Sequence, residues 1–555
     1  MREIAKVLGK ASMNEHAVNV MTDGFANGLN GFSSIRELID AMRKHIDNVE
    51  FLRYGIYLLA SLACTEALKD EIGIQSGVQL IIQVNQRYAD NYNLSKNCLF
   101  ALAQLSYRHA INCAFVMACK GIPLIIKMMR QYMTQPDLLE SAACVLGNLC
   151  FENDNNKTLI INEGGAQVMV ATLLNNLDQL DGVINTLSTI STLAHGPHAV
   201  DAILNAGGVQ AVVATMTVLG DTFTVVDASM RVLNRLASNA SEAHMAIMAQ
   251  EGAVQAIVEV AAAHSNAAEI ALLCVTALCD LATMVSNADL IIKQGGCEVV
   301  IAALTVLGND AEFVEMAIRL LFNLTYSVNN LNRIINAGVA RAVLFALQHQ
   351  INAVQVVSIG LRTITNLCYT DEVAVKLAED GPIEFILQLM QNALVSPMIG
   401  SDAIITESTI ALSALCRPEQ NALAMASAAI QLSSSCLRAY GANYMVCKDV
   451  CAFLANLFVH GPAAIVAMEH TILQDMLRVI SVHLMNPEYL LVACKPLENM
   501  TYGSQGVRDY MKQNLIIEKM NEVINNNADR EDVKKAANAV ILAVNRTDFI
   551  SDSLD

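Results

Sequence analysis

The amino-acid sequence predicts an all-α protein, a solenoid built from about twelve stacked helical repeats. Three observations support this prediction: short turns recur every 42 to 48 residues, apolar residues between them follow helical periodicity, and no stretch alternates polar and apolar residues as β-hairpins do. The chain has 555 residues. A repeat array can reach this length without a domain boundary, because each repeat packs only on its neighbours.

The turns define the period of the repeat. They lie at Gly31, Gly77, Gly121, Gly165, Gly208, Gly252, Gly296, Gly338 and Gly381, and the spacing continues without glycine at Ala429, Thr471 and Leu515. Glycine after a helix accommodates the left-handed backbone conformation that closes it. A β-branched residue tolerates that conformation poorly, so Gly296→Val is expected to disturb the stack locally.

Each repeat shows the same order of helices. One helix ends in a motif such as INEGG, LNAGG or IKQGG, and a second follows with apolar residues at three- and four-residue spacing, as in Val209–Leu219. A longer third helix carries VLGNLC, LLFNLT or TITNLC. The apolar residues fall on more than one face, as expected for helices that lie between neighbouring helices.

Composition and charge narrow the class of protein. Hydrophobic residues make up 54% and charged residues 16%, which is too apolar for a disordered chain. Apolar stretches end well short of the ~20 residues of a membrane helix, and the N-terminus lacks a secretory signal, so we expect no transmembrane segment and an intracellular, cytoplasmic location. The net charge of −18 disfavours nucleic acid as a partner.

Cysteine and histidine patterns suggest no cofactor and no metal. The fifteen cysteines are odd in number, lack CxxC spacing and mostly lie in apolar stretches, which indicates buried thiols. The chain carries no GxxxxGK[ST], HExxH or GxSxG motif. We therefore expect a protein that is not an enzyme and has no catalytic residue.

The pattern of glycine turn, helix, LxNLx helix and downstream asparagine resembles the armadillo repeat family, in the form of a protein made of armadillo repeats alone. The resemblance covers Gly31 to about Asn545 and implies a right-handed superhelix. It predicts partial capping helices at 1–30, repeats with strong consensus at 31–428, divergent repeats and a C-terminal cap at 429–545, and a tail at 546–555.

In armadillo proteins the third helices line a concave groove, and the asparagine of LxNL faces it. The resemblance implies this partner-binding role for Asn148, Asn323, Asn366, Asn456 and Asn499. Amides suit it because each offers a donor and an acceptor to an extended peptide. The same slot holds Ser61, Gln104, Thr192, Arg235, Asp280 and Ala414 elsewhere, so the ladder is broken. The alternative is that these asparagines only cap neighbouring turns.

Basic residues recur one helical turn before the asparagine slot. They are Arg231, Arg319, Arg362 and Lys495, with Arg235 in the slot itself. An arginine cluster in a groove suits an acidic or phosphorylated segment. Reversing the charge of Arg319 and Arg362 together is then expected to abolish binding of such a ligand and leave thermal unfolding nearly unchanged. The alternative is intramolecular pairing with acids such as Asp280 or Glu315.

Aromatic residues recur three positions after the slot. They are Tyr107, Phe151, Tyr326, Tyr369 and Tyr502. They suit the edge of a groove as anchors for a partner, since aromatic residues with a polar tip are frequent binding hot spots. The alternative is that they fill the seam between successive repeats.

The family resemblance implies a protein-protein interaction scaffold or adaptor that binds an extended peptide or a helix of its partner. Cytoskeletal, ciliary or trafficking assemblies are the expected setting. The nuclear-import adaptors of the family use paired tryptophan and asparagine, and this chain has no tryptophan. The alternative function is an armadillo-type regulator or chaperone of small GTPases, to which Leu146–Val170 is similar. The apolar repeats after Ala429 are the expected place for a homo-oligomer interface.

Overall fold

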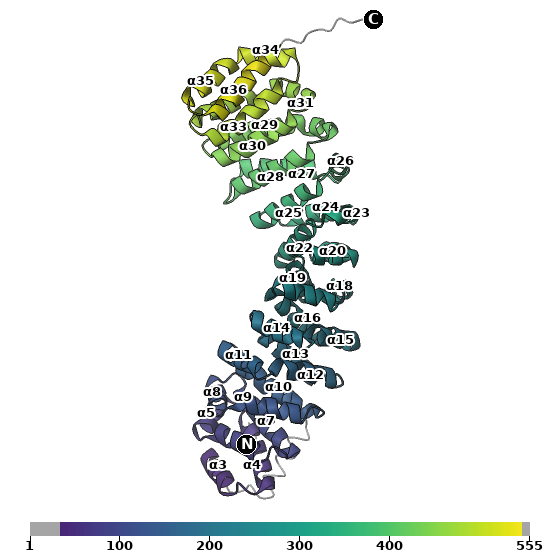
Figure 1. The fold of residues 1–555 in the computed structure, drawn as a ribbon, viewed down its shortest axis with the longest axis vertical. Coiled ribbons are helices and arrows are strands. Elements are labelled where there is room, and N and C mark those ends of the chain that lie inside the picture. The colour runs from purple at the N-terminus through teal and green to yellow at the C-terminus, as the bar shows by residue number, and fades with distance from the viewer. Residues whose placement is uncertain (1–33, 547–555) are drawn as a thin grey trace. The chain divides into compact units, whose positions relative to one another are not determined.

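The computed structural model describes residues 34–546, which form two compact units divided between Asn287 and Ala288. Throughout this range the regular structure is helical, with no strand, so the predicted all-α class is confirmed (Figure 1). The division falls inside α20 (Val285–Lys293). The predicted turn at Gly31, the cap at 1–30 and residues 547–555 of the predicted tail lie outside the described residues.

In the first unit three kinds of helix alternate along the chain. The short first helices are α5 (Glu66–Ile74), α8 (Ala110–Ala118), α11 (Asp154–Asn162), α14 (Pro197–Asn205) and α17 (Glu242–Gln250). The second helices are α3 (Ile35–Lys44), α6 (Gly77–Arg87), α9 (Gly121–Gln131), α12 (Gly165–Asn175), α15 (Gly208–Leu219) and α18 (Ala253–Ala263). The third helices are α4 (Val49–Leu62), α7 (Tyr92–Ser106), α10 (Pro136–Cys150), α13 (Leu180–Leu193), α16 (Phe223–Ser238) and α19 (Ala268–Leu281).

The second unit repeats the same order with more variation. Its first helices are η1 (Val328–Asn330) with α23 (Leu331–Asn336), α26 (Asp371–Ala378), α31 (Gly461–Val466) with η2 (Ala467–Glu469), and α34 (Gln505–Gln513). Its second helices are α21 (Gly296–Leu307), α24 (Val339–His349), α27 (Pro382–Val395), α32 (Ile472–Val482) and α35 (Ile516–Asn526). Its third helices are α22 (Ala311–Leu324), α25 (Val354–Leu367), α28 (Ser401–Leu415), α30 (Tyr444–Leu457), α33 (Pro487–Met500) and α36 (Glu531–Val544). A single longer helix, α29 (Glu419–Ala439), has no counterpart in the rest of the described chain.

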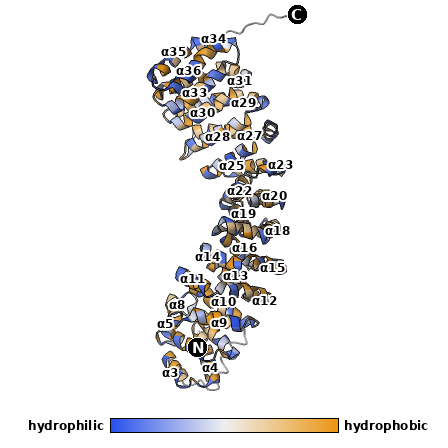
Figure 2. Ribbon diagram, viewed as in Figure 1, coloured by the Kyte–Doolittle hydropathy of each residue, from blue (hydrophilic) through white to orange (hydrophobic). Residues whose placement is uncertain are grey.

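The core of each unit lies between successive third helices, which pack side by side. In the first unit α10 packs between α7 and α13, and in the second α30 packs between α28 and α33. Buried residues therefore occupy several faces of one helix, as Leu146 and Leu149 do on α10. Figure 2 accordingly shows hydrophobic and hydrophilic residues interleaved along the helices instead of gathered at one end. This arrangement explains the high hydrophobic content without a membrane-spanning role for any one helix.

The bend between first and second helices confirms the predicted period and corrects its register in some repeats. The left-handed residue is the one directly before the second helix, and in most repeats it is glycine, as with Gly295 at φ 87°. Gly296 is already the first residue of α21, so its predicted left-handed conformation is wrong. Three repeats place other residues at the bend, namely Ser76, Lys120 and Leu515. Packing by the flanking helices thus imposes the bend even where glycine is absent.

Gly296→Val is still expected to destabilise the second unit, for a different reason. A Cβ at this position would lie 2.4 Å from Cγ2 and 2.9 Å from the carbonyl oxygen of Ile291, so the helix start must shift. Valine at the equivalent Val339, five residues after Ile334, shows that such a shift is possible. We expect a loss of about 1 kcal/mol, at the low end of overpacking costs, measured by urea unfolding. Wild-type stability would contradict the close contact.

The turn predicted at Ala429 is wrong. Ala429 is buried in the middle of α29, which is continuous for 21 residues and replaces a first and a second helix. The segment has no glycine and no proline after Pro418, and alanine and leucine favour a helix, so nothing in it interrupts the hydrogen-bond ladder. The spacing alone could not reveal this fusion.

Candidate functional site

A groove of about 1440 Å³ crosses the third helices of the first unit. Its floor comes from α7, α10 and α13, and its edge from α8, α11 and the turns that precede them. The lining residues are Ala103, Gln104, Ser106, Tyr107, Arg108, His109, Ala110, Cys113, Ala114, Met117, Cys144, Gly147, Asn148, Leu149, Phe151, Glu152, Asn153, Asn155, Asn156, Asn185, Ser188, Thr189 and Thr192. Three of the predicted site residues, Tyr107, Asn148 and Phe151, therefore share one hollow surface.

The floor of the groove is polar and uncharged. Gln104, Asn148 and Thr192 occupy the same slot on three successive third helices, and Asn185 lies two turns earlier on α13. Within residues 34–546 the side-chain amides of Gln104 and Asn185 have no hydrogen-bond partner, although both are half-buried. Each offers a donor and an acceptor to the backbone of an incoming segment. Gln104 was expected to break the asparagine ladder, whereas here a glutamine supplies the same amide group.

The edge of the groove carries two exposed aromatic rings. Tyr107 and Phe151 are the residues directly after α7 and α10, and they are 54% and 65% exposed. Lys69 Nζ donates a hydrogen bond of 2.7 Å to the Tyr107 carbonyl and lies 5.4 Å from the centroid of its ring. Such cation–π contacts hold an aromatic side chain in place at a surface.

A charged residue follows each of these rings and was missed by the sequence reasoning. Arg108 and Glu152 both line the groove, and both adopt a left-handed conformation at φ 50°. The signal for them is visible in the sequence, since Tyr107–Arg108 and Phe151–Glu152 stand at equivalent positions of successive repeats.

The predicted asparagines mostly connect neighbouring repeats. The Nδ2 bonds are Asn148 to Ala103 O at 3.1 Å and Ser106 Oγ at 3.0 Å, Asn366 to Thr325 Oγ1 at 2.9 Å, Asn456 to Ser413 Oγ at 2.5 Å, and Asn499 to Ala455 O at 2.8 Å. Each partner lies at the end of the preceding third helix or just after it, so the amide group bridges two repeats. Asn499 is buried, and Asn323 is half-buried on α22. Their role in partner binding stays a prediction.

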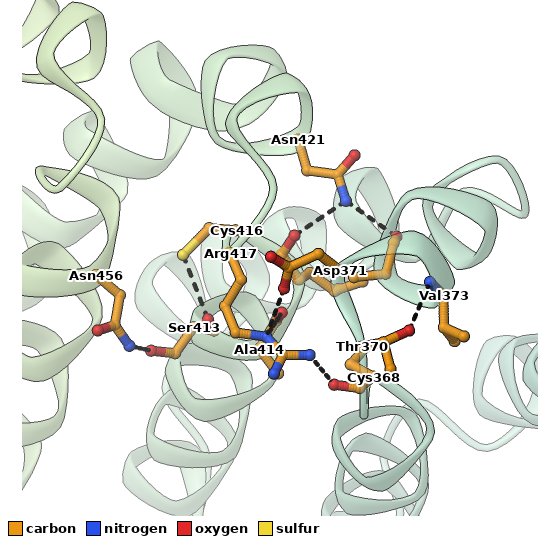
Figure 3. A network of polar contacts seen from close by, with 12 residues as sticks. Cys368, Thr370, Asp371, Val373, Ser413, Ala414, Cys416, Arg417, Asn421 and Asn456 are labelled. Atoms are coloured by element: carbon orange, nitrogen blue, oxygen red, sulfur yellow. Dashed lines mark hydrogen bonds and ion pairs between the residues drawn. The ribbon is translucent and has the colours of Figure 1, made fainter. Parts of the chain in front are cut away.

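A second set of asparagines, the downstream asparagine of the repeat pattern, holds the short helices. Asn421 Nδ2 donates to Ala374 O at 2.9 Å and Leu415 O at 3.0 Å, which joins α29 to both α26 and α28. Asn112 makes the equivalent bonds in the first unit, to Lys69 O and Leu105 O. Figure 3 shows Asn421 within a polar network in which Arg417 Nη2 also donates to Cys368 O. These buried amides are structural.

The predicted basic residues are mostly paired inside the protein. The ion pairs are Arg231 with Asp227 at 2.9 Å, Arg319 with Glu315 at 2.8 Å, Arg362 with Glu407, and Lys495 with Glu498 at 3.0 Å. Hydrogen bonding to Asp227 raises the pKa of Arg231, and bonding to Glu407 raises that of Arg362. For Arg319 the predicted alternative partner, Glu315, is the one found.

Arg235 and Asp280, a predicted basic residue and a predicted acidic partner, are not ion-paired with each other. Arg235 is exposed on α16, and no carboxylate of the described chain lies within 4 Å of it. Asp280, the other predicted partner, instead accepts a hydrogen bond of 2.8 Å from Ser238 Oγ, and burial raises the pKa of its carboxyl group. Because Arg231 and Arg235 belong to the first unit and Arg319 and Arg362 to the second, each pair is described within its own unit.

The predicted aromatic residues are all exposed, which argues against the alternative that they fill the seam between repeats. The exposed set is Tyr107, Phe151, Tyr326, Tyr369 and Tyr502. Tyr369 Oη donates to Asn332 Oδ1 at 2.6 Å, and Tyr326 stacks edge-on against Phe322. These contacts orient the rings at the surface without covering them.

The cysteines are mostly buried thiols. All fifteen thiols are free, and eleven are buried. Burial raises the pKa of the two groove thiols, Cys113 and Cys144, to about 11, so both are protonated at neutral pH and poor nucleophiles. Across residues 34–546 no three His, Cys, Asp or Glu side chains are grouped closely enough to hold a metal ion.

No helix in the described range is by itself both long and apolar enough to cross a bilayer. Four pairs of consecutive helices reach the required length and hydropathy only when taken together, and each pair is bent by more than 40°.

Comparison with known families gives one match over most of the chain. The model of the GAC ARM domain family matches residues 19–407. Armadillo repeat-containing protein 6 of Homo sapiens is 21% identical over 221 residues, which is 36% of this chain and 44% of that protein. The chain therefore spans less than half the length of this curated relative.

Comparison with solved structures agrees on the fold. A structure solved for a study of a conserved phosphorylation switch that controls the interaction between cadherin and beta-catenin aligns with a TM-score of 0.69 and 14% identity, over 93% of this chain and 100% of that one. An engineered protein aligns with a TM-score of 0.56 and 18% identity, over 84% of this chain and 99% of that one. At these identities the likeness concerns the fold alone.

Proposed function

Because the chain belongs to the GAC ARM domain family, we propose that it is a protein-interaction scaffold or adaptor that holds an extended segment of a partner protein in the groove of its first unit. Armadillo repeats generally serve as binding scaffolds without catalytic activity, and the beta-catenin of the similar structure interacts with cadherin. The proposal includes a cytoplasmic location within a cytoskeletal, ciliary or trafficking assembly, and self-association through the repeats after Ala429.

One observation supports the proposal above the others, namely the combination of unpartnered amides and exposed rings on one surface. Gln104 and Asn185 are half-buried without hydrogen-bond partners within the described chain, and desolvating an amide is costly unless a bond replaces the water. A peptide backbone supplies both the donor and the acceptor that such amides need. Tyr107 and Phe151 stand at the edge, where they would bury apolar area on a bound side chain.

The groove is tested with a peptide library displayed on phage and selected on the whole chain. Recovered peptides are synthesised, and their Kd is measured by fluorescence anisotropy. Phe151→Ala is expected to weaken binding at least tenfold, in the range of interface hot spots, because the ring is lost from the groove edge. Since Phe151 is exposed, this variant should keep the melting temperature of the wild type.

A matched control removes an exposed apolar side chain elsewhere in the same unit. Val218 lies on α15 outside the groove and is 61% exposed, so Val218→Ala should leave the affinity unchanged. The double variant Gln104→Leu and Asn185→Leu should weaken binding as Phe151→Ala does. Peptides that bind all of these variants equally well would show that the groove is not the binding surface.

The second candidate function is regulation of small GTPases. The segment Leu146–Val170, which resembles regulators of this type, runs from α10 into α12. Its part up to Asn156 contributes to the groove and includes the exposed carboxylate of Glu152. A basic GTPase tail would find a complementary charge there. Stimulated nucleotide exchange by a panel of small GTPases, measured with a fluorescent guanine nucleotide, would favour this function, and unchanged exchange rates across the panel would exclude exchange activity.

A further inference from the structure

The edge of the groove carries two charges of opposite sign at equivalent positions of neighbouring repeats. Arg108 follows Tyr107 after α7, and Glu152 follows Phe151 after α10. Both side chains are exposed and line the groove. Among residues 34–546 neither has an oppositely charged side chain within 4 Å, whereas most arginines of this unit are ion-paired. These two charges are therefore available to a ligand.

The dipole of the following helix disfavours a cation at position 108. Arg108 directly precedes His109, the N-cap of α8, and the positive end of the helix dipole disfavours a cation there. Its left-handed backbone would also suit glycine or asparagine better. Glu152 differs, since an anion before the N-cap of α11 is favoured by the dipole. Apart from its contact with the Tyr107 ring, Arg108 has no oppositely charged partner within 4 Å in the described chain, so its charge is open to a ligand.

A second cation reinforces the positive end of the edge. Lys69 Nζ and Arg108 Cζ each lie 5.4 Å from the centroid of the Tyr107 ring. No carboxylate of the described chain lies within 4 Å of Lys69 either. Lys69 is half-buried and lies outside the groove lining, so it adds positive charge near the Tyr107 ring, whereas Arg108 presents its charge in the groove itself.

The spacing between the two charges follows from helix packing. Neighbouring third helices lie about 8–10 Å apart, so Arg108 and Glu152 repeat at roughly this distance. An extended chain in the polyproline II conformation advances about 9.3 Å in three residues and brings the third residue back to the same face. Residues three apart on such a segment would therefore face both charges.

We propose that the groove selects an extended segment with one acidic and one basic side chain three residues apart, the acidic one at Arg108 and the basic one at Glu152. This inference rests on the proposed scaffold function and specifies its ligand. It locates the acidic-ligand site at the turn after α7, whereas the sequence predicted it among Arg231, Arg235, Arg319 and Arg362. All of these except Arg235 are ion-paired within the protein.

The test uses four displayed peptide libraries that share an apolar background and differ in two charges three positions apart. The pairs are acid–base, base–acid, acid–acid and base–base. One of the two mixed orders is expected to be enriched at least tenfold over both like-charge pairs. Equal recovery of all four classes, or enrichment of a like-charge pair, would overturn the inference.

Charge reversal then assigns each contact. Arg108→Glu should weaken the affinity for the best mixed-charge peptide at least tenfold. Replacing the acidic residue of that peptide with lysine should restore the affinity for this variant. Glu152→Lys should behave in the same way with the basic position. The controls are Lys120→Glu, which reverses an exposed lysine in the same left-handed conformation outside the groove, and Asp221→Lys in the loop before α16. If the variants and the controls lost affinity equally, the effect would come from the overall electrostatic field of the protein and not from contacts in the groove.

Failure of this inference is distinguishable from failure of the proposed function. If peptides bind Phe151→Ala more weakly but bind Arg108→Glu and Glu152→Lys as tightly as the wild type, the scaffold function is supported and the charge selection is wrong. Peptides indifferent to Phe151→Ala as well would remove both. Because the charges are exposed, the effect of Arg108→Glu should also shrink as salt rises from 50 to 300 mM, roughly as the screening length shortens.

Discussion

Arg362→Glu is expected to lower the free energy of unfolding of the second unit by about 2–3 kcal/mol. Arg362 Nε donates to Glu407 Oε1 at 2.7 Å, and Glu407 is only 7% exposed. Glutamate at position 362 would remove this partner and bring a second negative charge to a buried carboxylate. We expect less than the roughly 3–5 kcal/mol of a fully buried pair, because Arg362 itself is 56% exposed.

The neighbourhood of Glu407 strengthens this expectation. Asp449 is half-buried nearby, and burial raises the pKa of its carboxyl group, with a smaller contribution from the charge of Glu407. Urea unfolding followed by circular dichroism measures the effect, since the chain has no tryptophan for fluorescence. The matched control is Arg319→Glu, whose partner Glu315 is 37% exposed, so its loss should stay below about 1 kcal/mol. Equal losses in the two variants would contradict the role of burial.

This result would replace one expectation drawn from the sequence. Reversal of Arg319 and Arg362 together was expected to leave thermal unfolding nearly unchanged. Because Arg362 is paired with Glu407, the double reversal does not separate ligand binding from folding, since loss of affinity and loss of stability would coincide. Arg108→Glu avoids the difficulty, since Arg108 has no such partner in the described chain.

Asn421→Leu is expected to destabilise the second unit by about 2–4 kcal/mol. Its amide group donates to two buried carbonyl groups, those of Ala374 and Leu415, and leucine of similar size would remove both hydrogen bonds (Figure 3). Each unsatisfied buried polar group costs about 1–3 kcal/mol. The measurement is again the free energy of unfolding in urea.

Asn456→Leu provides the control in the same network. Asn456 is exposed and donates only to Ser413 Oγ, so water can replace the amide and the loss should remain below about 1 kcal/mol (Figure 3). A loss as large as that of Asn421→Leu would show that exposure does not separate the two asparagines. A negligible loss for Asn421→Leu would mean that its bonds to α26 and α28 do not hold the repeats together.

Much of the fold could be predicted from the sequence because its signals are local. The period, the helix order and the all-α class follow from turns and apolar spacing within each repeat. Two features could not be predicted in this way: which glycine at Gly296 adopts the left-handed conformation, and the joining of two helices into one at Ala429. At Gly296 two adjacent glycines left the choice of left-handed residue open, and around Ala429 the helix forms because nothing interrupts it.

The candidate site was less predictable because pairing and exposure depend on contacts between repeats. The acids that pair with Arg231 and Arg319 lie four residues earlier on the same helix, so these two ion pairs could be predicted from the sequence. Glu407 lies 45 residues after Arg362, in the next repeat, and its pairing could not. The exposure of Tyr107 and Phe151 depends on how α7 and α10 end, and the free amide group of Gln104 depends on what surrounds it. The pairing of Arg362, the exposure of the two rings and the free amide group of Gln104 cannot be predicted from the residues of one repeat alone.

The continuous helix α29 has a consequence for how the second unit loses its structure. Elsewhere a bend separates the short first helix from the second, so one can fray while the other stays packed. Within α29 a single hydrogen-bond ladder runs through a helix that packs on α26 and α27 as well as on α31 and α32. Opening at either end therefore weakens the other, and the repeats on both sides of this helix open as one cooperative block.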